Sequence, residues 1–230
     1  MTVTALADIS AAGLVRRASE QDHTAVERSL PVGPALRPLF PGGCLRRGST
    51  VLLAGRPGST SLLFALLAEA SAAGTWCAAV GLPSLGLVAA AEAGVAVERL
   101  ALVPHPGPEW TAVVAALLDG VEIVVAAVPG SVPARVAERL AARARQRGGV
   151  LVPVGRWPGA DLTLDVVDGA WHGLGRGHGR LRAREVRVAA YGRGAAARTR
   201  FADLWLPAGI APPDPRPSRL THTPVLELAG

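Results

Sequence analysis

The chain contains no lysine, few aromatic residues and little cysteine, and each absence narrows what the protein can be. All 24 basic residues among its 230 are arginine. Aromatic residues make up only 4% of the sequence, so a core has to be built from Ala, Val and Leu. The two cysteines, Cys44 and Cys77, are too few for a disulfide framework and lack metal-ligand spacing, which fits a reducing compartment.

Long apolar runs are also absent. No stretch approaches the roughly 18 uninterrupted apolar residues of a membrane-spanning helix. The first residues carry Asp8 and lack the basic-then-apolar order of a signal peptide, so we expect a cytoplasmic protein without membrane contact. A hydrophobic content of 50% at this length predicts one domain with a sizeable core. The net charge of +6 and the pI of about 11.0 favour an acidic partner or nucleic acid.

Three regions follow from the pattern along the chain. Residues 4–28 predict a helix that is moderately amphipathic through Leu6, Ile9, Leu14 and Val26. We expect residues 1–29 to form a helical arm that packs on the main body; docking onto a neighbouring subunit or partner is the alternative. Residues 30–206 form the core, and the proline-rich residues 207–230 are expected to be poorly ordered.

Within the core, apolar strand and helix patterns alternate, which predicts a mainly parallel sheet with right-handed crossovers. The expected strands are 50–54, 75–80, 97–104, 121–128 and 150–154, and the expected helices are 60–73, 85–93, 108–118 and 131–147. Ser131 is expected to cap the last helix, with Pro133 in its first turn and a buried stripe at Val132, Val136, Leu140 and Ala144. After residue 160, segments 161–167, 181–191 and 200–206 predict an antiparallel meander. The predicted fold class is α/β, with helices flanking the parallel sheet and the meander at the C-terminal end.

The segment 49–67 has the layout of a phosphate-binding loop: a buried strand, a glycine-bearing turn and an apolar helix that begins near Ser59. The side chains that do the chemistry in such a loop are missing, because Ser61 stands at the lysine position and Leu62 at the magnesium-binding hydroxyl. A planar guanidinium does not reproduce the contacts of a compact ammonium group, so arginine is a poor substitute. The degenerate loop consists of Gly55, Arg56, Pro57, Gly58, Ser59, Thr60 and Ser61.

The order of these segments, from residue 30 to residue 206, resembles the core of the RecA recombinase family. By this resemblance Ala126 stands at the Walker B carboxylate, and the water-activating glutamate falls near Pro83. Without a cation, a metal ligand or a base, nothing stabilises a transferring phosphoryl group. We therefore expect no catalytic residue, no metal site, no bound ATP and no ATP hydrolysis. The two DNA-binding loops of such a core are shortened to 127–131 and 155–161.

The segments 173–182 and 192–207 resemble a narrower group, the ImuA-type accessory proteins of bacterial mutasomes, especially the actinobacterial type. That resemblance implies a non-catalytic scaffold in the SOS response to DNA damage, acting in error-prone translesion synthesis and induced mutagenesis. The implied partners are an inactive Y-family polymerase homologue (ImuB) and a DnaE-type polymerase. The alternative is a RecA paralogue that binds nucleotide or single-stranded DNA without hydrolysis. The sequence leaves the oligomeric state open.

The basic charge is concentrated between Trp171 and Arg200, which hold eight arginines and one acidic residue. We expect the cluster to occupy one small region and to meet an acidic partner, a protein in preference to DNA; a solubility face is the other interpretation. Its candidate contact residues are Arg176, Arg180, Arg182, Arg193, Arg198 and Arg200. The histidines His105, His172 and His178 do not share metal-ligand spacing.

Overall fold

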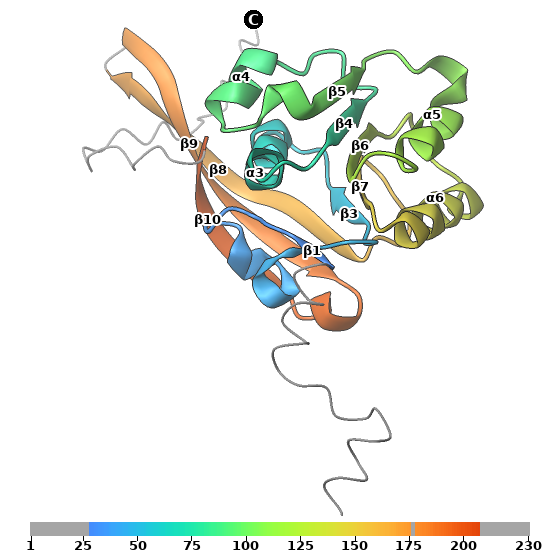
Figure 1. The fold of residues 1–230 in the computed structure, drawn as a ribbon. Coiled ribbons are helices and arrows are strands. Elements are labelled where there is room, and N and C mark those ends of the chain that lie inside the picture. Colours follow the sequence, from blue (N-terminus) through green and yellow to red (C-terminus); the bar gives the residue numbers. More distant parts are fainter. Residues whose placement is uncertain (1–27, 176–177, 208–230) are drawn as a thin grey trace, which may run out of the picture.

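The computed structural model describes residues 28–175 and 178–207 (Figure 1). The helix expected at the N-terminal end, the proline-rich residues from 208 onward and Arg176 lie outside the described residues.

An eight-stranded mixed sheet forms the centre of the molecule, in the order β10-β9-β8-β3-β7-β6-β4-β5. Strands β3 to β8 pair in parallel, and β8, β9 and β10 pair antiparallel. A second sheet pairs β1 (Ser29–Leu30) with β2 (Leu45–Arg46). The strands of the large sheet are β3 (Val51–Leu53), β4 (Cys77–Val80), β5 (Leu100–Val103), β6 (Ile123–Ala127), β7 (Val150–Val154), β8 (Leu162–Gly175), β9 (His178–Gly192) and β10 (Arg200–Leu206).

Helices cover both faces of the parallel part of this sheet. Helix α3 (Ser59–Ala72) and helix α4 (Leu87–Glu92) share one apolar core with Val51 and Leu53 of β3. Helix α5 (Trp110–Leu117) and helix α6 (Ala134–Arg147) share a second core with Leu151 of β7 and with Leu52, which lies between Val51 and Leu53 on β3. Alternate strand residues point to opposite faces, so the two cores lie on opposite sides of the sheet (Figure 1). Five short 3₁₀ turns complete the described elements: η1 (Arg37–Leu39), η2 (Pro41–Gly43), η3 (Val97–Arg99), η4 (Gly107–Glu109) and η5 (Gly194–Ala196).

The predicted fold class is confirmed. The sheet is mainly parallel and flanked by helices, and the C-terminal meander continues the same sheet through the parallel pairing of β8 with β3. The β6–α6 and β7–β8 connections are short, at residues 128–133 and 155–161. Among the described helices none is both long enough and apolar enough to cross a bilayer.

The predicted start of α6 is wrong. The helix begins at Ala134, Pro133 takes the N-cap position in an extended conformation, and no side chain caps the helix. Proline disfavours the helical conformation of the residue before it, so the helix does not reach back over Val132, and Ser131 lies two residues before the N-cap. The predicted stripe itself is confirmed: Leu140 and Ala144 are buried together with Ala137, and Val132 and Val136 are partly buried against the same core.

The hairpin of β8 and β9 is much longer than the sequence pattern predicted. Strand β8 continues past residue 167 to Gly175, and strand β9 begins before residue 181, at His178. Their pairing is irregular between Val166 and Asp168 and between His172 and Leu174. Glycine weakens a strand pattern, which is why this glycine-rich segment looked like a turn. Gly169 is needed there, because a Cβ would lie 3.0 Å from the carbonyl oxygen of Glu185 on the paired strand. The far end of the hairpin projects beyond the helices (Figure 1).

Candidate functional site: a degenerate phosphate loop

The loop between β3 and α3 is a glycine-bearing turn that leads directly into the N-terminus of a helix. Gly55 and Gly58 have φ of 71° and 98°, a conformation that favours glycine. Gly58 is the N-cap of α3, and the amide of Ser59 donates to the carbonyl oxygen of Arg56 at 2.9 Å. The helix begins at Ser59 as predicted, so the turn presents the positive end of a 14-residue helix.

The side chains of this loop differ from those that a phosphate-binding loop uses. Leu62 is fully buried in the core, so the position expected for a magnesium-binding hydroxyl contributes packing instead. Ser61 is half-buried and Thr60 is exposed, and neither carries a cation. Ala126, at the Walker B position, is also fully buried, and Pro83 is exposed. Within the described ranges no group of three or more His, Cys, Asp or Glu residues is arranged to hold a metal ion.

An ion pair engages the loop's own arginine. Nε of Arg56 lies 2.9 Å from Oδ1 of Asp165, whose side chain is only 12% exposed and comes from β8. A buried carboxylate against the loop offsets the arginine and repels an incoming anion. Asp165 lies within the predicted strand 161–167, but the sequence pattern could not pair it with Arg56, because the contact joins residues more than a hundred positions apart.

Arg184 is a second feature that the sequence analysis did not single out. It lies on β9, and its guanidinium lies so close to Gly58 that a Cβ there would meet a terminal nitrogen at 2.7 Å. The same guanidinium lies over the ring of Trp171, 5.5 Å from its centroid, and its Nε is shielded without a hydrogen-bond partner in the described structure. Only the pairing of β8 with β9 brings Trp171 opposite Arg184, so no local signal could have found this contact.

Of the six candidate arginines, the five with a described backbone position do not lie in one small region, which corrects that part of the prediction. Arg180 and Arg182 lie on the part of β9 near the hairpin's far end, whereas Arg193 follows the opposite end of that strand. At about 3.3 Å per residue, a 15-residue strand separates its two ends by roughly 45 Å. Figure 1 shows the two ends on opposite sides of the molecule.

The arginines at the β10 end bind the protein's own backbone. Arg193 donates to the carbonyl oxygen of Gly159 and lies 4.0 Å from Asp161. Arg200 donates to the carbonyl oxygens of Ala195 and Arg198, at 3.2 and 3.4 Å. Their positive charge therefore helps to fix the turn between β9 and β10. Arg198 itself is exposed.

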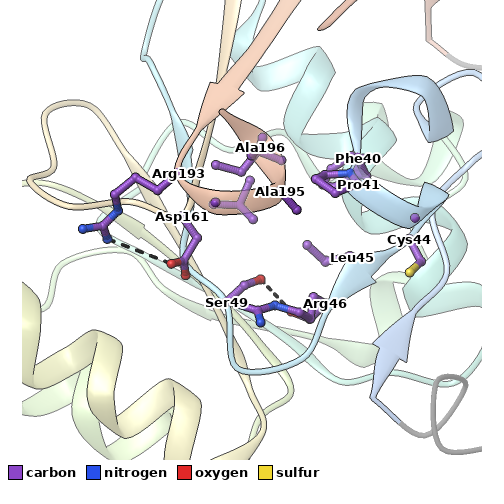
Figure 2. Close-up of a pocket in the computed structure, with 14 residues that line it drawn as sticks. Phe40, Pro41, Cys44, Leu45, Arg46, Ser49, Asp161, Arg193, Ala195 and Ala196 are labelled. Carbon is purple, nitrogen blue, oxygen red and sulfur yellow. Dashed lines mark hydrogen bonds and ion pairs between the residues drawn. The ribbon is translucent and has the colours of Figure 1, made fainter. Parts of the chain in front are cut away.

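A cavity of about 590 Å³ lies beside this turn (Figure 2). Its walls are mainly apolar; Asp161 and Arg193 face each other on one side, and Ser49 and Arg46 lie along another (Figure 2). Asp161 also accepts a hydrogen bond from the amide of Thr50 at 2.9 Å, and Ser49 donates to the carbonyl oxygen of Arg46 at 2.6 Å. The lining includes Phe40, Pro41, Cys44, Leu45, Arg46, Val51, Leu162, Ala195 and Ala196.

The parallel sheet flanked by helices, the glycine-bearing turn between β3 and α3 and the closing meander define an α/β protein. The chain belongs to the family described as the MT3502 N-terminal domain, which matches residues 38–159, more than half of the chain. The matched segment includes the loop, α3 and Ala126 and ends before the hairpin.

Two similar proteins add to this. The chain is 40% identical over 118 residues to the uncharacterized protein Rv3395c of Mycobacterium tuberculosis, a match that covers 51% of this chain and 52% of that protein. The match therefore spans about half the length of the relative. Among solved structures, the chain is similar to the RadB recombinase, with a TM-score of 0.46 and 15% identity over 67% of this chain and 86% of that one.

Proposed function

We propose that this protein is a non-catalytic accessory protein of an error-prone translesion synthesis complex, acting in damage-induced mutagenesis. One observation carries the non-catalytic part: the loop keeps its backbone form, while its arginine is paired with Asp165 and Leu62 is turned into the core. Phosphoryl transfer depends on cations placed around the transferring group. The described residues around the loop contain neither a lysine nor a metal cluster. The protein then acts by assembly instead of ATP hydrolysis.

The resemblance to ImuA-type proteins supports the choice of partners, an inactive Y-family polymerase homologue (ImuB) and a DnaE-type polymerase. The hairpin's far end offers a contact surface, because it projects beyond the helices (Figure 1) and because Arg180 and Arg182 lie in this part of strand β9. Charged groups on such a surface set which partner binds and how fast.

Co-purification with the Y-family homologue tests this proposal. Reversal of both charges, Arg180→Glu with Arg182→Glu, should weaken binding by about tenfold or more. The matched control is Arg135→Glu with Arg139→Glu, which reverses two exposed charges on α6 and should leave binding unchanged. No binding by the unaltered protein, or equal losses in both variants, would contradict the proposal.

A second candidate is nucleotide or single-stranded DNA binding without hydrolysis. It is favoured by Arg184, whose guanidinium lies against Gly58 and whose Nε has no partner among the described residues. Its test is a thermal shift with ATP in the wild type and in Arg184→Ala, together with the salt dependence of DNA affinity. A phosphate-binding site should give a shift that the variant loses, and each phosphate contact on a single strand lowers log K by about 0.7 per log unit of salt. Absence of both effects leaves the accessory role alone.

A further inference from the structure

We propose that the cavity beside the β9–β10 turn is a docking site for residues 1–27 of the same chain. The cavity's volume of about 590 Å³ falls in the range of small-molecule sites, but its chemistry does not suit a polar ligand. Asp161 is engaged by the amide of Thr50 and by Arg193, and the Ser49 hydroxyl donates to a neighbouring carbonyl. The walls that remain are apolar, so an apolar segment of chain fits them better.

The N-terminal residues start at the cavity's edge. Ser29 pairs with Arg46, which lines the cavity, and the carbonyl oxygen of Arg28 accepts a hydrogen bond from the amide of Arg47 at 2.8 Å. The 27 preceding residues are thus tethered beside the opening. Such a tether gives an effective concentration of about millimolar, which favours docking within one chain over docking between two.

The charge and the apolar residues of segment 1–27 both match the cavity. Residues 1–27 contain two arginines and four acidic residues, whereas the remaining 203 residues carry an excess of basic charge. Arg46 is exposed at the cavity and has no side-chain partner among the described residues, so it can meet an acidic residue of the segment. Leu14 and Val15 supply adjacent apolar side chains, and 14 residues of helix would span only about 21 Å from the point of attachment.

Cys44 gives a direct readout, because it lines the cavity and is half-buried. The other cysteine, Cys77, is fully buried, and burial followed by the charge of Glu122 raises its pKa to about 12. A maleimide therefore reacts at Cys44 in the native chain, at a rate that reports whether the cavity is covered.

The experiment compares full-length proteins. Leu14→Asp with Val15→Asp should raise the labelling rate of Cys44 by about tenfold, the factor expected if docking contributes ~1.4 kcal/mol. The matched control, Leu220→Asp with Val225→Asp, changes apolar residues in the C-terminal segment and should leave the rate unchanged. In a second variant, Ala195→Trp fills the cavity, and trypsin should then cleave faster after Arg16 and Arg17 than in the wild type.

Equal labelling rates in the wild type and the Leu14/Val15 variant would overturn the proposal, as would unchanged cleavage in Ala195→Trp. A wild-type labelling rate that falls as protein concentration rises would assign the cavity to a second copy, and would overturn docking within the chain. A Cys44 labelling rate that is independent of protein concentration, and that only the Leu14→Asp with Val15→Asp variant raises, supports docking within the chain.

Discussion

Single residues show how closely the meander is joined to the loop. Gly192 ends β9 opposite Leu162, and a Cβ at this position would overlap the carbonyl oxygen of Asp161. The Asp161 carboxylate in turn accepts a hydrogen bond from the amide of Thr50, the residue that immediately precedes β3. The absence of a side chain at residue 192 therefore lets the meander approach the strand that leads into the loop.

Gly192→Ala should lower the free energy of unfolding by about 2–3 kcal/mol, because backbone atoms cannot yield to the added methyl group. Urea denaturation measures this. The matched control is Gly120→Ala, where the added Cβ meets nothing within 4 Å and the change should stay within about 0.5 kcal/mol. Equal effects at the two positions would show that the close approach is not what matters.

The buried thiol of Cys77 makes the free energy of unfolding decrease as the pH rises into the alkaline range. Its pKa is raised from 9.0 to about 12, first by burial and then by Glu122. The unfolded chain releases this proton at lower pH than the folded chain, so the stabilisation is complete below pH 9 and is lost as pH rises toward 12. The chain has no lysine, so few other groups titrate in this window.

Between pH 9 and about 12, Cys77 should contribute a loss of up to ~1.4 kcal/mol per pH unit to the free energy of unfolding. Denaturant titrations at several pH values should show a shallower decline in Cys77→Ala, while Cys44→Ala, at the half-buried cysteine, keeps the steep one. A wild-type decline no steeper than that of Cys77→Ala would be inconsistent with a raised pKa.

At the scale of elements, an exposed ion-pair group joins α5 to α6. Asp119, just after α5, accepts hydrogen bonds from Nε of Arg143 at 2.9 Å and Nε of Arg147 at 3.0 Å. The bond from Arg143 is the main cause of the lowered pKa of Asp119. Arg143 and Arg147 stay about half exposed while their guanidinium groups hold Asp119 beside α6.

Asp119→Asn should lower Tm slightly at neutral pH, because the carboxylate's stabilisation is present above its unfolded pKa of 3.8. As pH falls through the lower folded pKa the difference from the wild type should vanish. Thermal unfolding over this range is the measurement. Glu138→Gln, which removes an exposed charge on the same helix, is the control, and a Tm difference that persists in acid would contradict the assignment.

The sequence predicted elements well where the pattern was strong and long. The apolar runs at β6 and β7 and the glycine turn before α3 are local signals, and the structure contains all three. The start of α6 was placed too early, because Pro133 was read as a first-turn proline although it takes the N-cap position. The length of the β8–β9 hairpin was missed, because its glycines weaken a strand pattern. The ion pair of Arg56 with Asp165 and the contact of Arg184 with Gly58 depend on strand register, which no local pattern specifies.

At the scale of the whole molecule, the basic hairpin and the altered loop are parts of one sheet. β8 pairs with β3 on one side and with β9 on the other, so a partner bound to the hairpin contacts the same sheet that carries the loop. We propose that this core acts by holding proteins together. The proposed accessory role rests on that combination.

The most direct test of this role is the frequency of damage-induced mutations in cells. We expect deletion of the protein to lower that frequency, and both the wild type and a variant with Thr60→Ala and Ser61→Ala to restore it equally at matched protein levels. These substitutions remove the hydroxyl groups left at the end of the loop while sparing the buried Leu62. No effect of deletion, or failure of the loop variant to restore mutagenesis, would contradict a non-catalytic role in translesion synthesis.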